Sequence, residues 1–386
     1  MEPYIIDTTL RDGEQAPGVI FCIKEKLKIA KFLQKIGVNE LEVGTPAMGE
    51  NEIQDIKIIS EKYQKIRIST WCRALRNDLD LAIKTGVRAV NISFPVSHIL
   101  LSSMNKDQKW IFSHMPDLLN YANDHFEYVS VGAQDASRAD ISFLLDFISD
   151  CENFHVHRVR IADTIGIMNP VSVNDLIKQI RFNFAEITLE FHAHNDFGMA
   201  TANALVALSS GANAISVTVN GLGERAGNAA LEEVIMALKH SFHVDSKYNT
   251  ALLTDLSNYV ANAAHRKIDP AKPIVGDRVL THETGVHVHS IIKNRKSYQP
   301  FFANEVGRKE DEFLFGKHTG KSALKALLKE SGLQHNIINI NKLLSVIKVH
   351  SCNLKRSLSK NEVLGILNTL MQNANQHTEA SLHDVI

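Results

Sequence analysis

Two histidines that are one residue apart are the most informative feature of this sequence. His192 and His194 come at the end of an apolar run, residues 187–191, that predicts a buried strand. Alternate residues of a strand point the same way, so both imidazoles leave one face and can bind one metal ion. Two hydrogen-bonded loop histidines would explain the pair equally well in a chain with 18 histidines, so other segments must decide.

Two further segments place polar residues directly after strand-like runs. Residues 8–15, Thr-Thr-Leu-Arg-Asp-Gly-Glu-Gln, follow the run 4–7, and packing such charges beside a strand end is costly unless they pair or bind something. The glycine-rich segment 220–228 follows the run 214–219, and its glycines permit positive φ and close backbone approach. A surface ion pair and a tight loop remain alternatives for these segments, whereas the glycine spacing does not fit a dinucleotide site.

Apolar runs and amphipathic stretches alternate regularly up to about residue 240. Strands are expected at residues 4–7, 39–44, 66–71, 89–93, 128–133, 156–162, 187–192 and 214–219. Helical stretches between them include residues 24–35, 50–63, 107–123, 141–150, 171–180 and 201–209. Such alternation predicts an α/β fold with a parallel sheet, and eight units predict a (β/α)₈ TIM barrel. The three polar segments then follow neighbouring strands, at the carboxyl-terminal face where these barrels hold active sites.

The regular alternation ends near residue 246. We therefore expect a catalytic barrel over residues 1–245, a linker and lid subdomain over 246–316, and a mainly helical C-terminal region over 317–386. Helices are expected at residues 249–266, 317–331, 337–350 and 361–373.

Composition predicts a soluble, cytoplasmic protein that binds neither nucleic acid nor a membrane. The formal net charge of −1 provides no electrostatic footprint for nucleic acid or an anionic membrane. The four cysteines are dispersed, which indicates reduced thiols rather than a disulfide framework. No signal peptide or long apolar span is apparent.

One carboxylate, two imidazoles and one amide would make a mixed oxygen and nitrogen metal site. The ligands we expect are Asp12, His192, His194 and Asn228. This set suits Mg²⁺ or Mn²⁺, with Fe²⁺, Co²⁺ or Zn²⁺ as alternatives, and the absence of cysteine disfavours a closed structural zinc site. Two coordination positions would stay open, and a 2-oxo acid can fill both through its carboxylate and keto oxygens.

An arginine next to the expected carboxylate ligand could stabilise negative charge. Arg11 precedes Asp12 and stays protonated, so we expect it to stabilise the oxygen that becomes anionic when a carbon nucleophile attacks the ketone. Glu14 is a candidate to orient Arg11.

Taken together, the motifs at residues 8–15, 192–196 and 221–228 resemble the 2-isopropylmalate synthase/homocitrate synthase family, whose members are metal-dependent Claisen-condensing TIM-barrel enzymes. Within that family the sequence is most similar to the homocitrate synthases of nitrogen-fixation systems. The likeness runs from about residue 4 to about residue 325. It implies an acyltransferase that converts acetyl-CoA, 2-oxoglutarate and water into homocitrate and CoA, with Arg11 as the oxyanion-stabilising residue.

The resemblance also implies roles outside the metal site. Thr164, after the sixth strand, would contact the carboxylate of the 2-oxo acid. His287 and Tyr298 would come from a lid subdomain that closes over the barrel of the neighbouring subunit, which implies a homodimer. Glu190, together with His287, would remove a methyl proton from acetyl-CoA. The alternative for His287 is that it binds adventitious metal with His289 or caps a helix.

One position departs from the family pattern and leaves the 2-oxo acid open. Many relatives have glutamate where this chain has Gln134, and an amide neither acts as a base nor repels a substrate carboxylate. We therefore predict that Gln134 is a substrate-side group. For the distal carboxylate of 2-oxoglutarate, Arg73 is the first candidate and Arg138 the second.

Three other interpretations compete with a homocitrate synthase. A 2-isopropylmalate or citramalate synthase would use another 2-oxo acid, and an acyl-CoA lyase would have a reactive cysteine in the segment 221–228, which has none. A non-catalytic metal-binding scaffold need not keep Arg11 and His287 beside the ligands. The run 316–322 is one residue short of a P-loop and more simply caps a helix beginning near Thr319.

Overall fold

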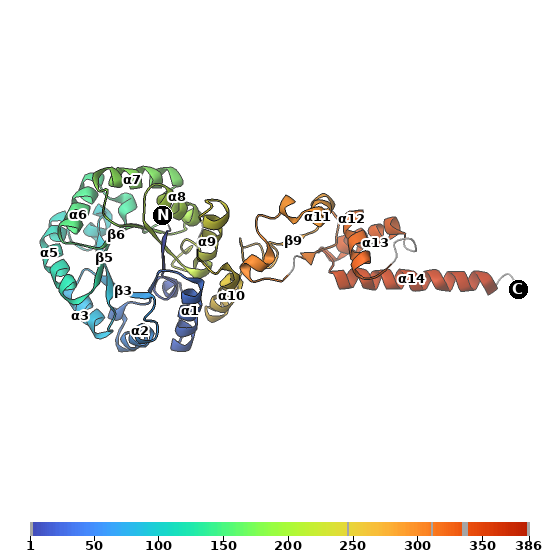
Figure 1. The fold of residues 1–386 in the computed structure, drawn as a ribbon, viewed down its shortest axis with the longest axis horizontal. Coiled ribbons are helices and arrows are strands. Elements are labelled where there is room, and N and C mark those ends of the chain that lie inside the picture. The colour runs from blue at the N-terminus through green and yellow to red at the C-terminus, as the bar shows by residue number, and fades with distance from the viewer. Residues whose placement is uncertain (1–2, 245–246, 310–311, 334–338, 384–386) are drawn as a thin grey trace. The chain divides into compact units, whose positions relative to one another are not determined.

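The predicted barrel is confirmed by the computed structural model, which describes residues 3–244, 247–309, 312–333 and 339–383 (Figure 1). Eight parallel strands close into a ring in chain order, and the last strand pairs with the first. The strands are β1 Tyr4–Asp7, β2 Glu40–Glu42, β3 Arg67–Arg73, β4 Ala89–Pro95, β5 Tyr128–Gln134, β6 Arg158–Asp163, β7 Leu189–Ala193 and β8 Ala214–Val217.

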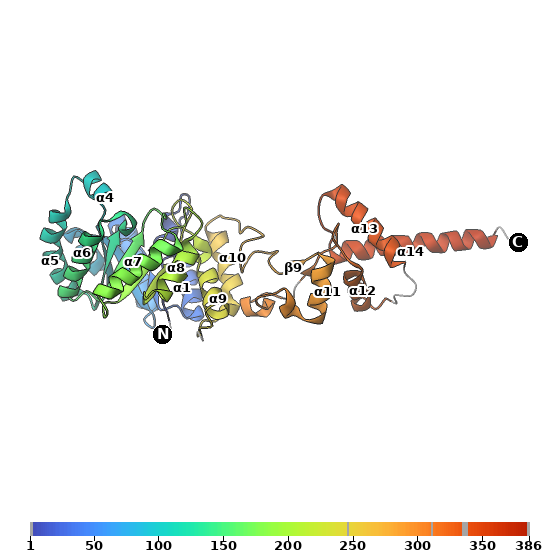
Figure 2. The same cartoon turned by 90° about the horizontal axis from the view of Figure 1, so that it is seen from above.

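Helices surround the ring of strands (Figure 1). They are α1 Ile23–Ile36, α2 Glu50–Lys62, α3 Arg76–Lys84, α5 Gln108–His125, α6 Ile141–Asn153, α7 Pro170–Asn183, α8 Ala200–Ser209 and α9 Leu231–His240. The short helix α4, His98–Ser103, lies in the loop after β4, and Figure 2 shows it standing above the carboxyl-terminal face of the ring. The six helices expected in this region are present, and α3 and α9 were not among them.

Most strands have their apolar side chains outside and their polar side chains inside the barrel. In β6, Val159 and Ile161 are fully buried on the side that faces the helices. Arg158 and Arg160 alternate with them and reach across the barrel to Glu40 and Glu42 of β2. The barrel interior is therefore filled with charged groups, whereas branched apolar side chains are the usual filling of such a barrel.

The barrel unit extends past the predicted boundary. Residues up to Ile268, with Pro273–Val275, form one compact unit, and the predicted boundary at 245 and 246 lies outside the described residues. The helix expected at 249–266 is α10, Leu253–Ala263, which packs against α1. It belongs to the barrel rather than to a lid.

The second compact unit comprises Asp269–Lys272 and the chain from Gly276 onward. Its elements are β9 Thr281–His282, α11 Gly285–Lys293, β10 Glu312–Phe313, α12 Lys321–Glu330, α13 Ile340–Leu354 and α14 Lys360–His383. One apolar core joins Val288 of α11, Leu324 of α12, Ile347 of α13 and Val363 of α14, so the segments that we expected as separate lid and helical regions form one body. The start of the helix expected at 337–350 lies outside the described residues, and α14 continues beyond its expected end at residue 373.

Among the described residues, no helix combines the length and apolar character needed to cross a lipid bilayer.

Candidate active site and metal centre

Asp12, His192 and His194 converge at the carboxyl-terminal mouth of the barrel. The Nε2 atoms of the two imidazoles are 3.2 Å apart. An Asp12 carboxylate oxygen, Oδ2, lies 3.0 Å from Nε2 of His192 and 3.8 Å from Nε2 of His194. All three side chains are buried, and their ligand atoms lie within 4.8 Å of one another, which is the arrangement of a metal-binding triad.

A tight turn after β1 places the first ligand. The carbonyl of Thr8 accepts hydrogen bonds from the backbone amides of Arg11, Asp12 and Gly13, at 3.1, 2.8 and 3.1 Å. The chain therefore folds back over the end of the strand. The hydroxyl of Thr9 accepts a hydrogen bond of 2.8 Å from the backbone amide of Val219, which ties this turn to the end of β8.

The glycine-rich loop after β8 holds Asn228 beside the histidines. Asn228 forms an isolated β-bridge with His194, and its amide Nδ2 donates to the Leu222 carbonyl at 3.1 Å. Gly227 has φ +88°, and a Cβ at that position would lie 1.9 Å from the Gly221 carbonyl oxygen. Only glycine fits such an approach, which allows the loop to close tightly beside Asn228.

The polar atoms at this site fit a divalent cation. Within the described residues, neither carboxylate oxygen of Asp12 nor Oδ1 of Asn228 accepts a hydrogen bond, although all are buried. Such unpaired oxygens are costly to bury unless a cation or water satisfies them. Burial opposes ionisation of Asp12, but the Arg11 guanidinium and the two imidazoles outweigh it and hold the pKa of that carboxyl well below its usual range. Burial and the neighbouring His192 lower the pKa of His194 to about 4, so its imidazole is neutral at pH 7, as a metal ligand requires.

Arg11 is held in place by Glu42 and not by Glu14. Arg11 Nε donates to Glu42 Oε1 at 2.5 Å, and its Nη1 lies 3.4 Å from Asp12 Oδ2. Glu14, which we expected to orient Arg11, instead accepts a hydrogen bond from the Phe21 amide and pairs with Lys26 at 3.1 Å. The turn after β1 directs Glu14 to the side of α1, whereas Glu42 projects into the barrel from β2.

A chain of buried ion pairs continues from Arg11 into the barrel. Arg160 links Glu42, at 2.7 Å, to Glu190, at 2.6 Å. Arg158 then links Glu190, at 2.7 Å, to Glu40, at 2.9 Å. We call these six side chains the core ion chain, in the order Arg11, Glu42, Arg160, Glu190, Arg158 and Glu40. Carboxylates and guanidiniums alternate along it, so each buried charge faces opposite charges.

This chain argues against the role expected for Glu190. Its side chain is fully buried one strand layer below His192, between Arg158 and Arg160, and it also accepts a hydrogen bond from Ser216. A carboxylate that is held by two guanidiniums and closed off from solvent cannot reach the methyl group of a thioester. The resemblance therefore assigned Glu190 a catalytic role that the barrel interior does not allow.

Both arginines proposed for the distal substrate carboxylate are already paired. Arg73 ends β3 on the inward-facing register, two residues after Trp71, and its guanidinium contacts both oxygens of the buried Asp78 at 2.9 Å. Arg138 contacts Asp135 at 2.6 Å. Each guanidinium therefore keeps only part of its edge for another anion.

Thr164 and Gln134 lie at the same mouth. Thr164 follows β6, and its hydroxyl oxygen accepts a hydrogen bond of 2.8 Å from the Asp135 amide, which leaves its proton available to a substrate. Gln134 ends β5 on the inward-facing register. Arg225 binds the Thr164 carbonyl at 2.8 Å and both oxygens of Asp196, so it fastens the loops after β6, β7 and β8 together.

His287 and Tyr298 belong to the second compact unit. Their rings stack with centroids 4.1 Å apart and an interplanar angle of 27°. His287 lies on α11 and is exposed, and Tyr298 is 45% exposed. The two side chains expected to act together thus form a pair.

Sequence reasoning missed Glu42, Arg158 and Arg160. A signal was present, because both β2 and β6 place charged residues two positions apart, around an apolar residue. In a strand covered by helices outside, that pattern puts the charges inside the barrel.

Comparisons with known proteins agree with this geometry. The HMGL-like family model matches residues 2–260, and the model described as the homocitrate synthase post-HMGL domain matches residues 274–354. The chain is 42% identical to 2-isopropylmalate synthase 2 of Caldanaerobacter subterraneus subsp. tengcongensis, over 94% of both chains. It is also 42% identical to homocitrate synthase 1 of a Nostoc species, over 94% of this chain and 96% of that one. A putative (R)-citramalate synthase of Archaeoglobus fulgidus is 35% identical, over 96% of this chain and 76% of that one.

Solved structures share the fold. The hydroxymethylglutaryl-CoA lyase of Pseudomonas aeruginosa superposes with a TM-score of 0.62 at 18% identity, over 69% of this chain and 94% of that one. Because one family model spans most of the chain and relatives match it along nearly all its length, the chain belongs to the 2-isopropylmalate synthase/homocitrate synthase family of acyltransferases.

Proposed function

We propose that this enzyme condenses acetyl-CoA with 2-oxoglutarate and water to give homocitrate and CoA. One observation carries the proposal, namely that a buried Asp-His-His triad lies beside an arginine held by Glu42. A keto acid that chelates a cation at the triad would bring its keto oxygen next to a fixed positive charge, which is what attack on a ketone requires.

Asp12, His192, His194 and Asn228 would hold the divalent cation, with Mg²⁺ or Mn²⁺ preferred for this ligand set. Such a cation supplies Lewis acidity to the keto group of the 2-oxo acid. The protein contributes preorganisation, because Arg11 is fixed by Glu42 and needs no rearrangement when the keto oxygen gains charge. The Thr164 hydroxyl would donate to the substrate carboxylate.

Removal of a methyl proton from acetyl-CoA needs a base that lies outside the barrel core. Glu190 is enclosed by Arg158 and Arg160, and the amide of Gln134 cannot accept the proton as a base. His287 is exposed and stacked on Tyr298, so we assign it the methyl proton. The resulting enolate carbon forms a bond to C2 of the 2-oxo acid, while the π pair of the keto group moves onto its oxygen, which then takes a proton. Water hydrolyses the thioester and releases CoA.

We further propose a homodimer in which the second unit of one subunit covers the barrel of the other. Apolar side chains are exposed in the loops at the barrel mouth, with Ile20 82%, Met48 72% and Phe197 68% exposed. Val286, next to His287, is 69% exposed. Scattered exposed apolar residues are normal, but several of them in the loops of one active-site mouth support a covering partner.

The choice of 2-oxo acid rests on the relatives and on Arg73. Homocitrate synthases recur among the relatives, and Arg73 offers a cation on the inward register at the mouth. The pairing of Arg73 with Asp78 favours the alternative, a 2-isopropylmalate or citramalate synthase, because it neutralises the charge that a second substrate carboxylate needs.

A panel of 2-oxo acids distinguishes homocitrate synthesis from the alternative. Release of the CoA thiol from acetyl-CoA would be measured with 2-oxoglutarate, 2-oxoisovalerate, pyruvate and oxaloacetate, in the presence of Mg²⁺ or Mn²⁺. We expect the highest kcat/KM with 2-oxoglutarate. Release with 2-oxoisovalerate or pyruvate alone would reject homocitrate synthesis in favour of the alternative, and no release with any of the four acids would reject a condensing enzyme.

A further inference from the structure

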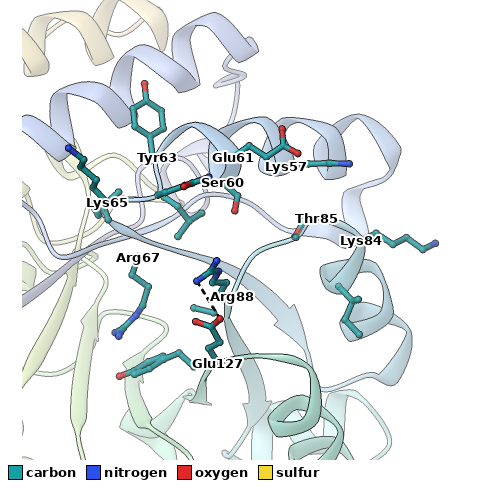
Figure 3. A pocket seen from close by; sticks show the side chains of 17 residues that line it. Lys57, Ser60, Glu61, Tyr63, Lys65, Arg67, Lys84, Thr85, Arg88 and Glu127 are labelled. Atoms are coloured by element: carbon teal, nitrogen blue, oxygen red, sulfur yellow. Dashed lines mark ion pairs between the residues drawn. The ribbon is translucent and has the colours of Figure 1, made fainter.

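A cavity of about 670 Å³ opens on the amino-terminal face of the barrel, at the opposite end from the metal ligands (Figure 3). It lies between the C-terminal ends of α2 and α3 and the first residues of β3, β4 and β5. Ile66 and Ile68 form an apolar part of its wall. Substrates of such barrels bind at the other face, so the proposed reaction does not use this cavity.

Cations outnumber acids in its lining. The basic residues are Lys57, Lys65, Arg67, Lys84 and Arg88, and the acidic residues are Glu61 and Glu127, which gives a difference of three positive charges. Arg88 lies 3.4 Å from Glu127, and a dashed line marks this ion pair in Figure 3. In the described part of the chain, Lys57, Lys65 and Lys84 form no ion pair. Like charges around one hollow repel one another. The carboxyl ends of α2 and α3 carry partial negative charge that offsets some of this repulsion, and a bound anion would offset more of it.

The guanidinium of Arg67 is a positive charge held in a fixed position in the wall of the cavity. Its guanidinium carbon lies 3.8 Å from the centre of the Tyr128 ring, and Nη1 donates to the Tyr4 hydroxyl at 2.8 Å. Glu40, the last member of the core ion chain, lies 3.7 Å from it. The side chain is about one third exposed, so part of its positive edge still faces the cavity. This cation is oriented before a ligand arrives, unlike the free lysines around it.

We propose that this cavity is a second ligand site, which binds a small anion of about two to three negative charges. Phosphate esters and tricarboxylates share this chemistry, and both are small enough for the volume. Arg67 would bind the anion at the wall, and Lys65 and Arg88 would supply further positive charge. Because these groups are partly exposed, the affinity falls as salt screens them.

The test is isothermal titration calorimetry of the metal-loaded enzyme with two probes, sodium sulfate and propane-1,2,3-tricarboxylate. The double variant Lys65→Gln/Arg88→Gln removes two exposed cations from the lining and should leave the fold intact. A matched control, Lys31→Gln/Lys178→Gln, removes two exposed lysines from α1 and α7. We expect the cavity variant to bind at least one probe about fivefold or more weakly than the control, and wild-type binding to weaken as NaCl rises.

Three results would overturn the proposal. They are no heat of binding for either probe at low ionic strength, equal affinity in the cavity and control variants, and loss of binding in Arg11→Gln with retention in the cavity variant. The last result would place the anion at the metal centre. Binding of sulfate alone supports a phosphate-type ligand, and binding of the tricarboxylate alone supports a carboxylate ligand. Comparison of the two probes therefore also identifies the chemical class of the ligand.

Discussion

Replacing Glu42 with glutamine tests whether the core ion chain prepares Arg11 for catalysis. Glu42 is fully buried, and its two oxygens accept hydrogen bonds from Arg11 at 2.5 Å and from Arg160 at 2.7 Å. Glutamine keeps the shape of the side chain. It removes the negative charge and turns one acceptor into a donor that faces a guanidinium.

The expected loss of stability follows from the two ion pairs that Glu42 makes with Arg11 and Arg160. Breaking a buried ion pair typically costs about 3–5 kcal/mol, because the remaining charge is left uncompensated. Arg160 keeps Glu190 and Arg11 keeps Asp12, so we expect the lower end, about 3 kcal/mol of unfolding free energy. Outright removal of an oxyanion donor lowers kcat by about 10²–10³, and we expect a loss of kcat up to that size when Arg11 is present but no longer fixed by Glu42.

The assay is CoA thiol release under saturating substrates, together with urea unfolding and calorimetric titration of Mn²⁺. We expect Mn²⁺ affinity to change little, because Asp12, His192 and His194 are untouched. Glu14→Gln is the matched control, since Glu14 lies in the same segment but pairs with Lys26, and its kcat should stay within about twofold of wild type. A folded Glu42→Gln enzyme with wild-type kcat would refute the idea that Glu42 positions Arg11.

Four further outcomes can be checked. Arg73→Ala should raise the KM for 2-oxoglutarate about tenfold with kcat little changed, and an unchanged KM in steady-state kinetics would remove Arg73 from the substrate site. A mixture of inactive Arg11→Gln and His287→Ala subunits should regain about one quarter of wild-type activity if the second unit acts in trans, and none if it acts within one subunit. Mn²⁺ at about 100 times its Kd should stabilise the enzyme against urea by about 2.7 kcal/mol, and Asp12→Asn should lose this effect. Burial opposes the ionisation of Glu42, but Arg11 and Arg160 lower its pKa from 4.5 to about 2, so its contribution to stability should be complete above pH 4.5 and lost as pH falls toward 2 in acid unfolding.

The barrel and the convergence of Asp12, His192 and His194 could be predicted from the sequence for physical reasons that are local. Strand and helix periodicities repeat along the barrel, and the two histidines of a His-x-His pair at a strand end leave the same face of the strand. Once the strands were ordered around a barrel, Asp12 and Asn228 had to lie beside the two histidines.

The core ion chain could not be predicted in the same way. Arg158 and Glu40 lie 118 residues apart, and only the closed barrel brings them together. The alternation of Glu42 with apolar neighbours places it inside the barrel, but it does not say which arginines Glu42 will meet there. The error at Glu190 has the same origin, because a carboxylate two residues from a metal ligand suggests chemistry until its two arginine partners are known.

The alternating charges inside the barrel constrain how the enzyme can evolve. An apolar core tolerates a larger or smaller neighbour by local repacking, but a guanidinium that loses its carboxylate stays charged. Substitutions of the charged residues on these strands must therefore occur in compensating sets, which single mutations rarely supply. New substrate preferences should arise in the loops above them, and directed-evolution libraries for this enzyme are best confined there.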